Sequence, residues 1–194
     1  MTYSIIGSGN VGVALARQFV RSDIEVCIAN KRSPDSLTAL ANELGKKVTP
    51  TTLQDALKAE IVIFAVPFRA YTEIASAIAD WSGKIVIDAM NARDLTLEEL
   101  DGRESSDILA LALPGAKVVK TFNQLPAALL GSDPFQPSGR RVMFVASNDE
   151  RANAEVVRLV DQLGFAAIAL GRIAEGGALL RFRGALMLQN LIKP

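Results

Sequence analysis

Short apolar segments alternate with amphipathic segments along most of this chain. YSII (residues 3–6), IEVCIA (24–29) and IVIFAV (61–66) have the length and composition of strands, and the last is typical of a strand covered on both faces. Between the first two, NVGVALARQFVR (10–21) repeats apolar residues at helical spacing. The pattern therefore predicts a strand, a helix and a second strand at the start of the chain.

The same alternation continues toward the C-terminus. We expect further strands at residues 47–48, 84–90, 117–122, 141–147 and 165–171. The expected helices lie at residues 33–45, 51–58, 71–79, 148–164 and 175–191, with shorter helical stretches between the later strands. Ser33 is the expected N-cap of the first of these helices, and Gly45 is expected to end it.

Strands that alternate with helices predict βαβ units and a parallel sheet. The most loop-like segment, SDPFQPSG (132–139), is followed by too few residues for an independent domain, and we find no low-complexity linker. We therefore expect an α/β protein with one domain over residues 1–194, ending in a helix.

The first predicted strand leads into a glycine-rich turn, IIGSGNVG. Gly7, Gly9 and Gly12 form G-x-G-x-x-G between a strand and a helix, with a second strand at the spacing of a dinucleotide-binding unit. There the first glycine makes a tight turn, the second lets the backbone approach a pyrophosphate, and the third lets the helix pack on the sheet. The positive end of the helix dipole attracts the phosphates.

A glycine-rich turn without a ligand is the alternative, but the βαβ context favours nucleotide binding. The expected fold is accordingly a three-layer Rossmann-type α/β fold with a mostly parallel sheet. The residues of the turn expected to bind the cofactor are Gly7, Ser8, Gly9, Asn10, Val11 and Gly12.

The second predicted strand runs into CIANKRSPDSL, which lacks the acidic residue that binds ribose hydroxyls in NAD sites. Asn30 would not repel a phosphate as a carboxylate would. Lys31 and Arg32 can pair with a phosphate, Arg32 through a planar fork, and Ser33 can add a hydroxyl or only cap its helix. A solvated basic loop is the alternative interpretation. The missing acid and the adjacent cations favour NADP(H).

Composition narrows the chemistry further. The chain has no histidine and one cysteine, Cys27, inside a predicted strand. A Ser-His-Asp triad, a histidine proton shuttle and the usual zinc sites are therefore excluded, and we expect no metal. Lys and Arg balance Asp and Glu at 21 each, so no global field favours nucleic acid or an acidic membrane. Without a bilayer-spanning run or a secretory signal, we expect a cytoplasmic protein.

A set of segments spread over most of the chain points to a known family. They are IIGSGNVGVALA, NKRSPDSL, IVIFAVPF, IVIDAMNA, KVVKTFNQLPA and LVDQLGFAAIALG. Together they resemble the NADP-dependent oxidoreductase family typified by coenzyme F-420:NADP oxidoreductase. A similar module forms the NADPH-binding part of some membrane metalloreductases, and here only the function of the module without membrane helices carries over.

The resemblance implies roles at matched positions. Ala65, Val66 and Pro67 would lie along the dinucleotide, whereas Ala89, Met90 and Asn91 would lie near the nicotinamide. The acceptor pocket would be bordered by Phe122, Asn123, Gln124, Leu125 and Pro126. All of these follow predicted strands, at the carboxyl ends where open α/β sheets bind ligands. Purely structural roles are the alternative: a proline can stop a strand, and an asparagine can satisfy backbone groups.

One segment departs from the family pattern. The family often has Asp-Ala-Thr-Asn-Pro after the fifth strand, and this chain has DAMNAR. Met90 replaces a hydroxyl with a flexible apolar side chain, and Ala92 replaces a proline and restores an N–H donor. The shape of the pocket and the identity of the acceptor stay open at this point.

Hydride transfer between two flat redox rings needs no protein nucleophile, which fits a chain without histidine. Alcohol oxidation would need a proton-transferring His, Lys or Tyr, and neither Tyr3 nor Tyr71 belongs to a Tyr-x-x-x-Lys motif. We therefore expect no catalytic side chain, and an NADPH-dependent oxidoreductase that exchanges hydride with coenzyme F-420 or a flavin such as FMN or FAD.

Two other functions stay open. One is reduction of a quinone, or of a metal ion through bound flavin. The other is an NADPH-binding sensor or regulatory subunit without turnover. Relatives of the family are often dimers, so the resemblance implies a homodimer. The expected binding partner is a small-molecule redox acceptor.

Overall fold

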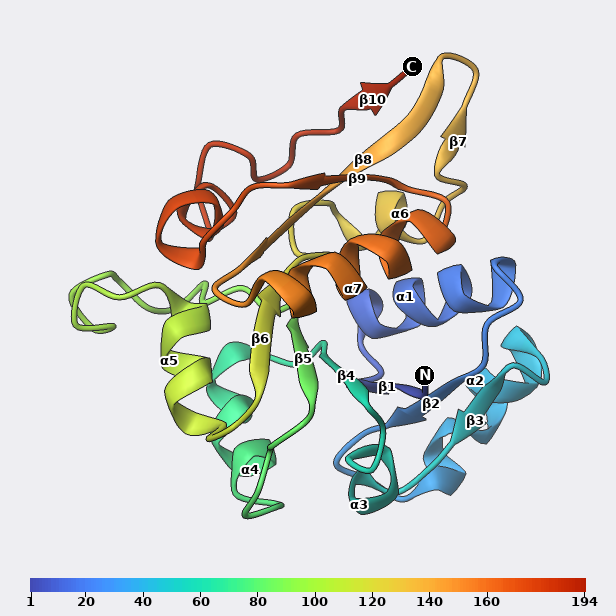
Figure 1. The fold of residues 1–194 in the computed structure, drawn as a ribbon. Helices are drawn as coiled ribbons and strands as arrows, with labels where there is room; N and C mark the ends of the chain where they lie inside the picture. Colours follow the sequence, from blue (N-terminus) through green and yellow to red (C-terminus); the bar gives the residue numbers. More distant parts are fainter.

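A sheet with helices on both faces forms the body of the protein (Figure 1). The structure is a computed structural model that describes residues 1–194. Six strands run parallel in the spatial order β3-β2-β1-β4-β5-β6. They are β1 (Tyr3–Ile6), β2 (Val26–Ala29), β3 (Val48–Pro50), β4 (Ile61–Phe64), β5 (Ile85–Asp88) and β6 (Lys117–Lys120). This order confirms the predicted Rossmann-type α/β fold.

Four more strands extend the sheet beyond β6. β8 (Gly139–Ser147) runs antiparallel to β6, and β9 (Ala166–Ala169) pairs parallel with β8. The short strands β7 (Phe135–Gln136) and β10 (Ile192–Lys193) both pair antiparallel with β8. The sheet is therefore mostly parallel, as the sequence predicts, with a mixed extension at one edge.

The helices divide between the two faces of the sheet (Figure 1). One face carries α1 (Asn10–Arg21), α2 (Thr38–Leu44), α6 (Ala127–Leu130) and α7 (Glu150–Gln162). The other carries α3 (Leu53–Ala56), α4 (Tyr71–Ala75) and α5 (Ser105–Ala112). Two short 3₁₀ turns, η1 (Pro34–Leu37) and η2 (Phe68–Ala70), lead into α2 and α4. None of the helices is both long and apolar enough to cross a membrane.

Strand β4 shows why its sequence is apolar at every position. Successive side chains of a strand point to opposite faces of the sheet. Ile61 and Ile63 pack into the core beneath α1 and α7, whereas Val62 and Phe64 pack into the core beneath α3 to α5. Both faces of the sheet are covered by helices, so the side chains on both faces of β4 are apolar.

The predicted C-terminal helix at residues 175–191 is wrong. The chain makes one π-helical turn, η3 (Ile173–Gly177), and then continues through turns to β10. Arg183 and Leu188 have φ angles of 67° and 64°, which a right-handed helix cannot contain. The apolar spacing was real, but Leu180 packs on β8 and β9 from an irregular segment.

Backbone pairing replaces the missing helix. The Leu188 amide donates to the Gln124 carbonyl at 2.8 Å, and the Val142 amide donates to the Leu191 carbonyl at 2.8 Å. The segment therefore satisfies its backbone groups against β8 and the loop after β6. The sequence predicts β9 as the last strand, but β10 follows it.

Several predicted boundaries also move. β4, β5 and β6 each end two residues earlier than expected, so the residues after them lie in loops at the carboxyl edge of the sheet. Ser33 occupies an N-cap position, but its side chain caps no amide. The helix expected at 51–58 shrinks to α3, where the Thr52 hydroxyl accepts from the Asp55 amide at 3.1 Å.

Candidate functional site

The glycine turn joins the carboxyl end of β1 to α1. Gly7 has a φ of 116°, and a Cβ added there would collide with the Ala65 carbonyl oxygen at the end of β4. A Cβ at Gly12 would collide with the Gly7 carbonyl oxygen. These two glycines are therefore required by the packing of the protein itself.

Gly9 is different, because a Cβ at this position would meet no protein atom within 4 Å. Its φ of −77° is accessible to any residue. The N–H groups of residues 8–12 make no backbone hydrogen bond at this exposed end of α1. Nothing in the fold explains a glycine here, whereas the close approach of an anionic ligand would.

A pocket of about 560 Å³ opens on the side of the turn next to β2. We call it the loop pocket, because the loop after β2 forms one wall and α4 forms another. Its lining residues are Ile6, Gly7, Ser8, Gly9, Asn30, Lys31, Arg32, Leu53, Ala65, Val66, Pro67, Ala70, Glu73 and Ile74. It contains both predicted cations of the loop after β2.

Asn30 holds this loop against the glycine turn. Its amide nitrogen donates to the Ser8 and Ser36 hydroxyls at 3.1 Å each, and its oxygen accepts from the Arg32 amide at 2.7 Å. Lys31 and Arg32 are exposed, and neither forms an ion pair. The loop therefore presents two uncompensated positive charges from a fixed backbone.

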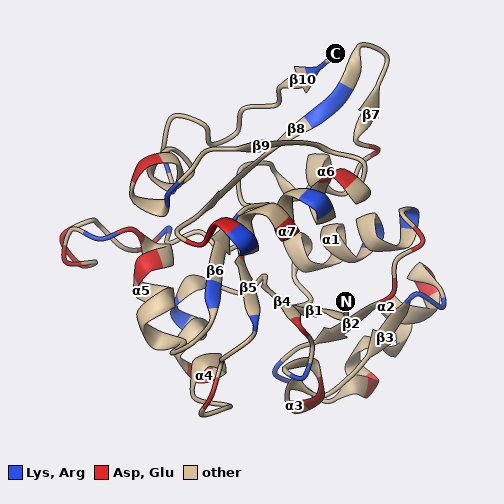
Figure 2. Cartoon of the chain, viewed as in Figure 1, with Lys and Arg blue, Asp and Glu red and all other residues tan.

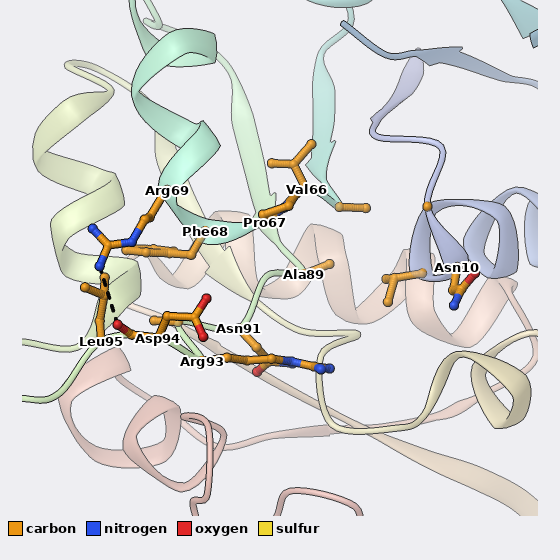
Figure 3. A pocket seen from close by; sticks show the side chains of 14 residues that line it. Asn10, Val66, Pro67, Phe68, Arg69, Ala89, Asn91, Arg93, Asp94 and Leu95 are labelled. Atoms are coloured by element: carbon orange, nitrogen blue, oxygen red, sulfur yellow. Dashed lines mark hydrogen bonds between the residues drawn. The ribbon is translucent and has the colours of Figure 1, made fainter. Parts of the chain in front are cut away.

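A second pocket of about 370 Å³ lies on the other side of the turn, over the ends of β4 and β5. We call it the ring pocket. Figure 3 shows Val66, Pro67 and Phe68 on one side and Asn91 and Arg93 on the other. The remaining lining residues are Gly9, Asn10, Val11, Ala65, Arg69, Ala89, Ala92, Asp94 and Leu95.

The two pockets share Gly9, Ala65, Val66 and Pro67. They therefore form one groove that crosses the glycine turn, where β1 and β4 are neighbours and their connections leave in opposite directions. Open α/β sheets bind dinucleotides at this crevice. The basic loop stands at one end and a largely apolar pocket at the other.

Residues 2–92 match the family described as NADP oxidoreductase, coenzyme F420-dependent. That segment contains β1 to β5, the glycine turn and most of the groove's lining. Over this segment the chain is similar to a family of NADP-dependent oxidoreductases, and the groove lies where Rossmann-type sheets bind a dinucleotide.

Solved structures share this fold over most or all of the chain. The crystal structure of the hypothetical protein SMa0349 from Sinorhizobium meliloti is 43% identical, with a TM-score of 0.96, and covers 100% of this chain and 96% of that one. A candidate F420-dependent NADP-reductase from Arthrobacter sp. FB24 is 28% identical, with a TM-score of 0.74, and covers 90% of this chain and 86% of that one.

A curated relative has a longer chain. Human metalloreductase STEAP2 is 30% identical over 176 residues, which are 90% of this chain but 34% of that protein. The chain therefore spans about a third of the length of the curated relatives it matches.

The side chains of Ala89, Met90 and Asn91 do not all face the ring pocket. Ala89 and Asn91 line the ring pocket, whereas the Met90 side chain is buried in the core beneath α3 to α5. The Met90 backbone instead meets a buried ion pair: its amide donates to Asp88 at 3.0 Å, and its carbonyl accepts from Lys120 at 2.6 Å. Met90 therefore does not shape the pocket through its side chain.

That ion pair anchors the floor of the ring pocket. Lys120 lies 3.1 Å from the Asp88 carboxylate, and both side chains are almost completely buried. The Ser106 hydroxyl donates to the same carboxylate at 2.6 Å. A buried, fully hydrogen-bonded pair of this kind fixes the ends of β5 and β6 relative to each other.

The residues expected at the acceptor are placed mostly inside the protein. Phe122, Asn123, Gln124 and Leu125 are buried, and Pro126 is exposed. None of the five lines the loop pocket or the ring pocket. Gln124 accepts from the Phe144 amide at 2.9 Å and donates to the Val142 and Gln189 carbonyls. Their contact with an acceptor stays a prediction.

Asn123 reaches the ring pocket indirectly, through Asn91. Its amide nitrogen donates to the Asn91 side-chain oxygen at 2.9 Å and to the Leu180 carbonyl at 2.6 Å. The Asn91 amide nitrogen donates in return to the Asn123 carbonyl at 3.2 Å. Asn91 is therefore held in one orientation at the pocket wall.

Four charged residues of the groove escaped the sequence interpretation. Arg69, Arg93 and Asp94 line the ring pocket, and Glu73 lines the loop pocket. The two arginines follow AVPF and AMNA, so a charge shortly after each strand's carboxyl end was an available signal. Glu73 lies on α4, and nothing in its local sequence indicates that it faces the loop after β2.

Proposed function

We propose that this protein transfers hydride between NADP(H) and a deazaflavin or flavin acceptor. The observation that supports this most is the continuous groove across the glycine turn, with the basic loop at one end and the ring pocket at the other. A dinucleotide laid along it would place its adenosine end in the loop pocket and its nicotinamide in the ring pocket.

Selectivity for the 2′-phosphate follows from the loop pocket. Lys31 and Arg32 carry no carboxylate partner, and Asn30 holds their backbone in place. A phosphate would gain charge-assisted hydrogen bonds without breaking an existing ion pair. Ser33 is exposed beside them and offers a hydroxyl.

The chain's contribution to the chemistry is placement. NADPH, when bound, supplies the hydride. Ala89, Val66 and Pro67 would bound the nicotinamide, Phe68 and Leu95 would exclude water, and Asn91 would fix the ring's orientation by its amide. The ring pocket contains no His, Tyr or Lys for proton transfer, and its one carboxylate, Asp94, is exposed, so a ring acceptor that takes up hydride directly suits it better than a carbonyl.

Metal reduction through bound flavin is the second candidate, because a relative 30% identical is a metalloreductase. The groove and the ring pocket would serve this reaction unchanged, since the flavin would occupy the acceptor position in both cases. The two functions differ only in what reoxidises the flavin.

The decisive experiment is oxidation of NADPH by the purified protein, followed by its absorbance, with NADH as a control. The acceptors are the deazaflavin coenzyme, FMN, FAD, a quinone, and ferric ion with and without flavin. Turnover with NADPH and a deazaflavin or flavin supports the proposal, and ferric reduction only in the presence of flavin supports the second candidate. Saturable NADPH binding with no turnover on any acceptor would overturn both and favour a sensor.

Other properties expected from the sequence stay predictions. We propose that residues 1–194 unfold as one domain, which a single calorimetric transition would support. We also propose a homodimer, which a monomer mass in light scattering would contradict. The cytoplasmic location likewise stays a prediction.

A further inference from the structure

A third pocket of about 370 Å³ adjoins the ring pocket. The two share Ala92, Arg93, Asp94 and Leu95, so they form one continuous hollow. We call the third one the arginine pocket. It lies between the loop that precedes α5 and the segment after η3, and its lining residues are Ala92, Arg93, Asp94, Leu95, Thr96, Leu97, Leu100, Arg103, Glu104, Ser105, Arg181, Phe182 and Arg183.

The charge of this pocket is unbalanced, although the net charge of the chain is zero. Four arginines face two acidic residues. Arg181 pairs with Glu104 at 3.3 Å, whereas Arg93, Arg103 and Arg183 have no carboxylate within ion-pair distance. Burial raises the pKa of Glu104, and the charge of Arg181 partly opposes this. Figure 2 shows basic residues beside acidic ones in the loop before α5 and in the turn after β9.

Two of the guanidinium groups are positioned by an aromatic ring. Arg93 and Arg183 lie 5.7 Å and 5.5 Å from the centre of the Phe182 ring. Arg183 also has a φ of 67°, which is unfavourable for a residue other than glycine. The chain turns at Arg183 and Gly184. Arginines that outnumber the carboxylates around one pocket attract an anion.

We propose that the arginine pocket binds a phosphate group carried by the hydride acceptor, while the acceptor's redox ring lies in the ring pocket. Several unpaired guanidiniums match the oxygens of a phosphate better than those of one carboxylate, since each planar fork can bond two oxygens. Arg93 lines both pockets and marks the junction between ring and phosphate. This inference rests on the proposed function and adds which residues hold the acceptor's phosphate group.

Riboflavin and FMN test the proposal, because they share one ring system and differ by the phosphate. We expect a KM for FMN at least about tenfold below that for riboflavin at saturating NADPH, the effect of roughly one charge-assisted hydrogen bond. Arg103→Gln with Arg183→Gln should bring the two KM values to within about threefold. Both side chains are exposed and unpaired, so folding should survive, and Arg103→Gln alone is the milder variant.

Arg151→Gln is the matched control. It removes one positive charge from an exposed position on α7, away from the pocket, and should leave the KM ratio unchanged. The KM for NADPH should also stay constant in the pocket variants, because neither Arg103 nor Arg183 lines the loop pocket.

Three outcomes would overturn the inference: equal KM values in the natural protein, a ratio that survives the double substitution, or a ratio that Arg151→Gln lowers equally. If neither flavin is reduced and the deazaflavin coenzyme is not reduced either, the proposed function fails, and the inference is decided by equilibrium binding. Flavin fluorescence should then show tighter binding of FMN than of riboflavin, and loss of that difference in the double variant.

Discussion

The substitution Gly9→Ala tests whether Gly9 is needed for ligand binding rather than for the stability of the fold. The added methyl group would meet no protein atom within 4 Å, and the φ of −77° accepts alanine. Alanine lowers the entropy of the unfolded chain but is a poorer N-cap than glycine, so we expect the free energy of unfolding to change by less than about 1 kcal/mol. The folded protein has no reason of its own to reject this side chain.

A bound dinucleotide, in contrast, would clash with the added methyl group. The methyl group would stand where the groove crosses the turn, and it would push a pyrophosphate away from the N–H groups at the start of α1. Loss of one or two charge-assisted hydrogen bonds costs about 2–4 kcal/mol, which weakens NADPH binding about 30-fold to 700-fold.

Gly12→Ala is the contrasting variant. Its Cβ would collide with the backbone oxygen of Gly7, which cannot move without opening the turn. Overpacking against backbone costs about 3 kcal/mol or slightly more, or about 6–12 °C in Tm for a chain of this size. This substitution should therefore lower stability first and binding as a consequence.

Calorimetry of unfolding and fluorescence titration with NADPH measure the two effects on the same samples. The expected result is a near-normal Tm with weak binding for Gly9→Ala, and a lowered Tm for Gly12→Ala. Normal NADPH affinity in a well-folded Gly9→Ala protein would refute the placement of the dinucleotide across the turn.

The remaining predictions concern the basic loop, the buried ion pair and one helix cap. Replacing Lys31 and Arg32 together by alanine should weaken NADPH by about 2–3 kcal/mol, roughly 30-fold to 150-fold, and leave NADH almost unaffected; equal losses in titrations with both cofactors would contradict the 2′-phosphate site. Lys120→Met should destabilise the protein by about 3–5 kcal/mol in urea unfolding, because Asp88 would stay buried and uncompensated; a smaller loss would mean that water reaches the carboxylate. Asp149→Ala should cost about 1 kcal/mol near neutral pH, since the Asp149 carboxylate caps α7. The hydrogen bond from the Ala152 amide lowers the pKa of Asp149, so this stabilisation is complete above the unfolded pKa, near 4, and is lost as the pH falls through the lower folded pKa. A difference between natural protein and variant that did not shrink in acid would argue against a charged cap.

The first half of the chain could be predicted closely, because its signals are local. β1 and α1 begin and end at the expected residues, since an apolar strand, a glycine turn and an amphipathic helix follow one another without competing patterns. The parallel order of the strands also followed from alternation, because a right-handed crossover leaves few other arrangements.

The C-terminal segment shows where local signals fail. Residues 175–191 have helical apolar spacing, yet the chain there pairs its backbone with β8 and with the loop after β6. Gly176, Gly177 and Gly184 make a helix costly, and the competing hydrogen bonds come from residues far away in the sequence. Spacing alone cannot weigh one against the other.

The fold class, the glycine turn and the cations after β2 could be predicted from the amino-acid sequence, because each rests on residues within a few positions of one another. Which side chains after β5 and β6 face the groove depends on long-range packing and became known from the folded chain. The tertiary structure turned Met90 into the core, used Gln124 to hold β8, and assembled the arginine pocket from two segments about eighty residues apart. The direction of a side chain at the end of a strand depends on the residues that pack against it. Those residues come from distant parts of the sequence and are brought together only by folding.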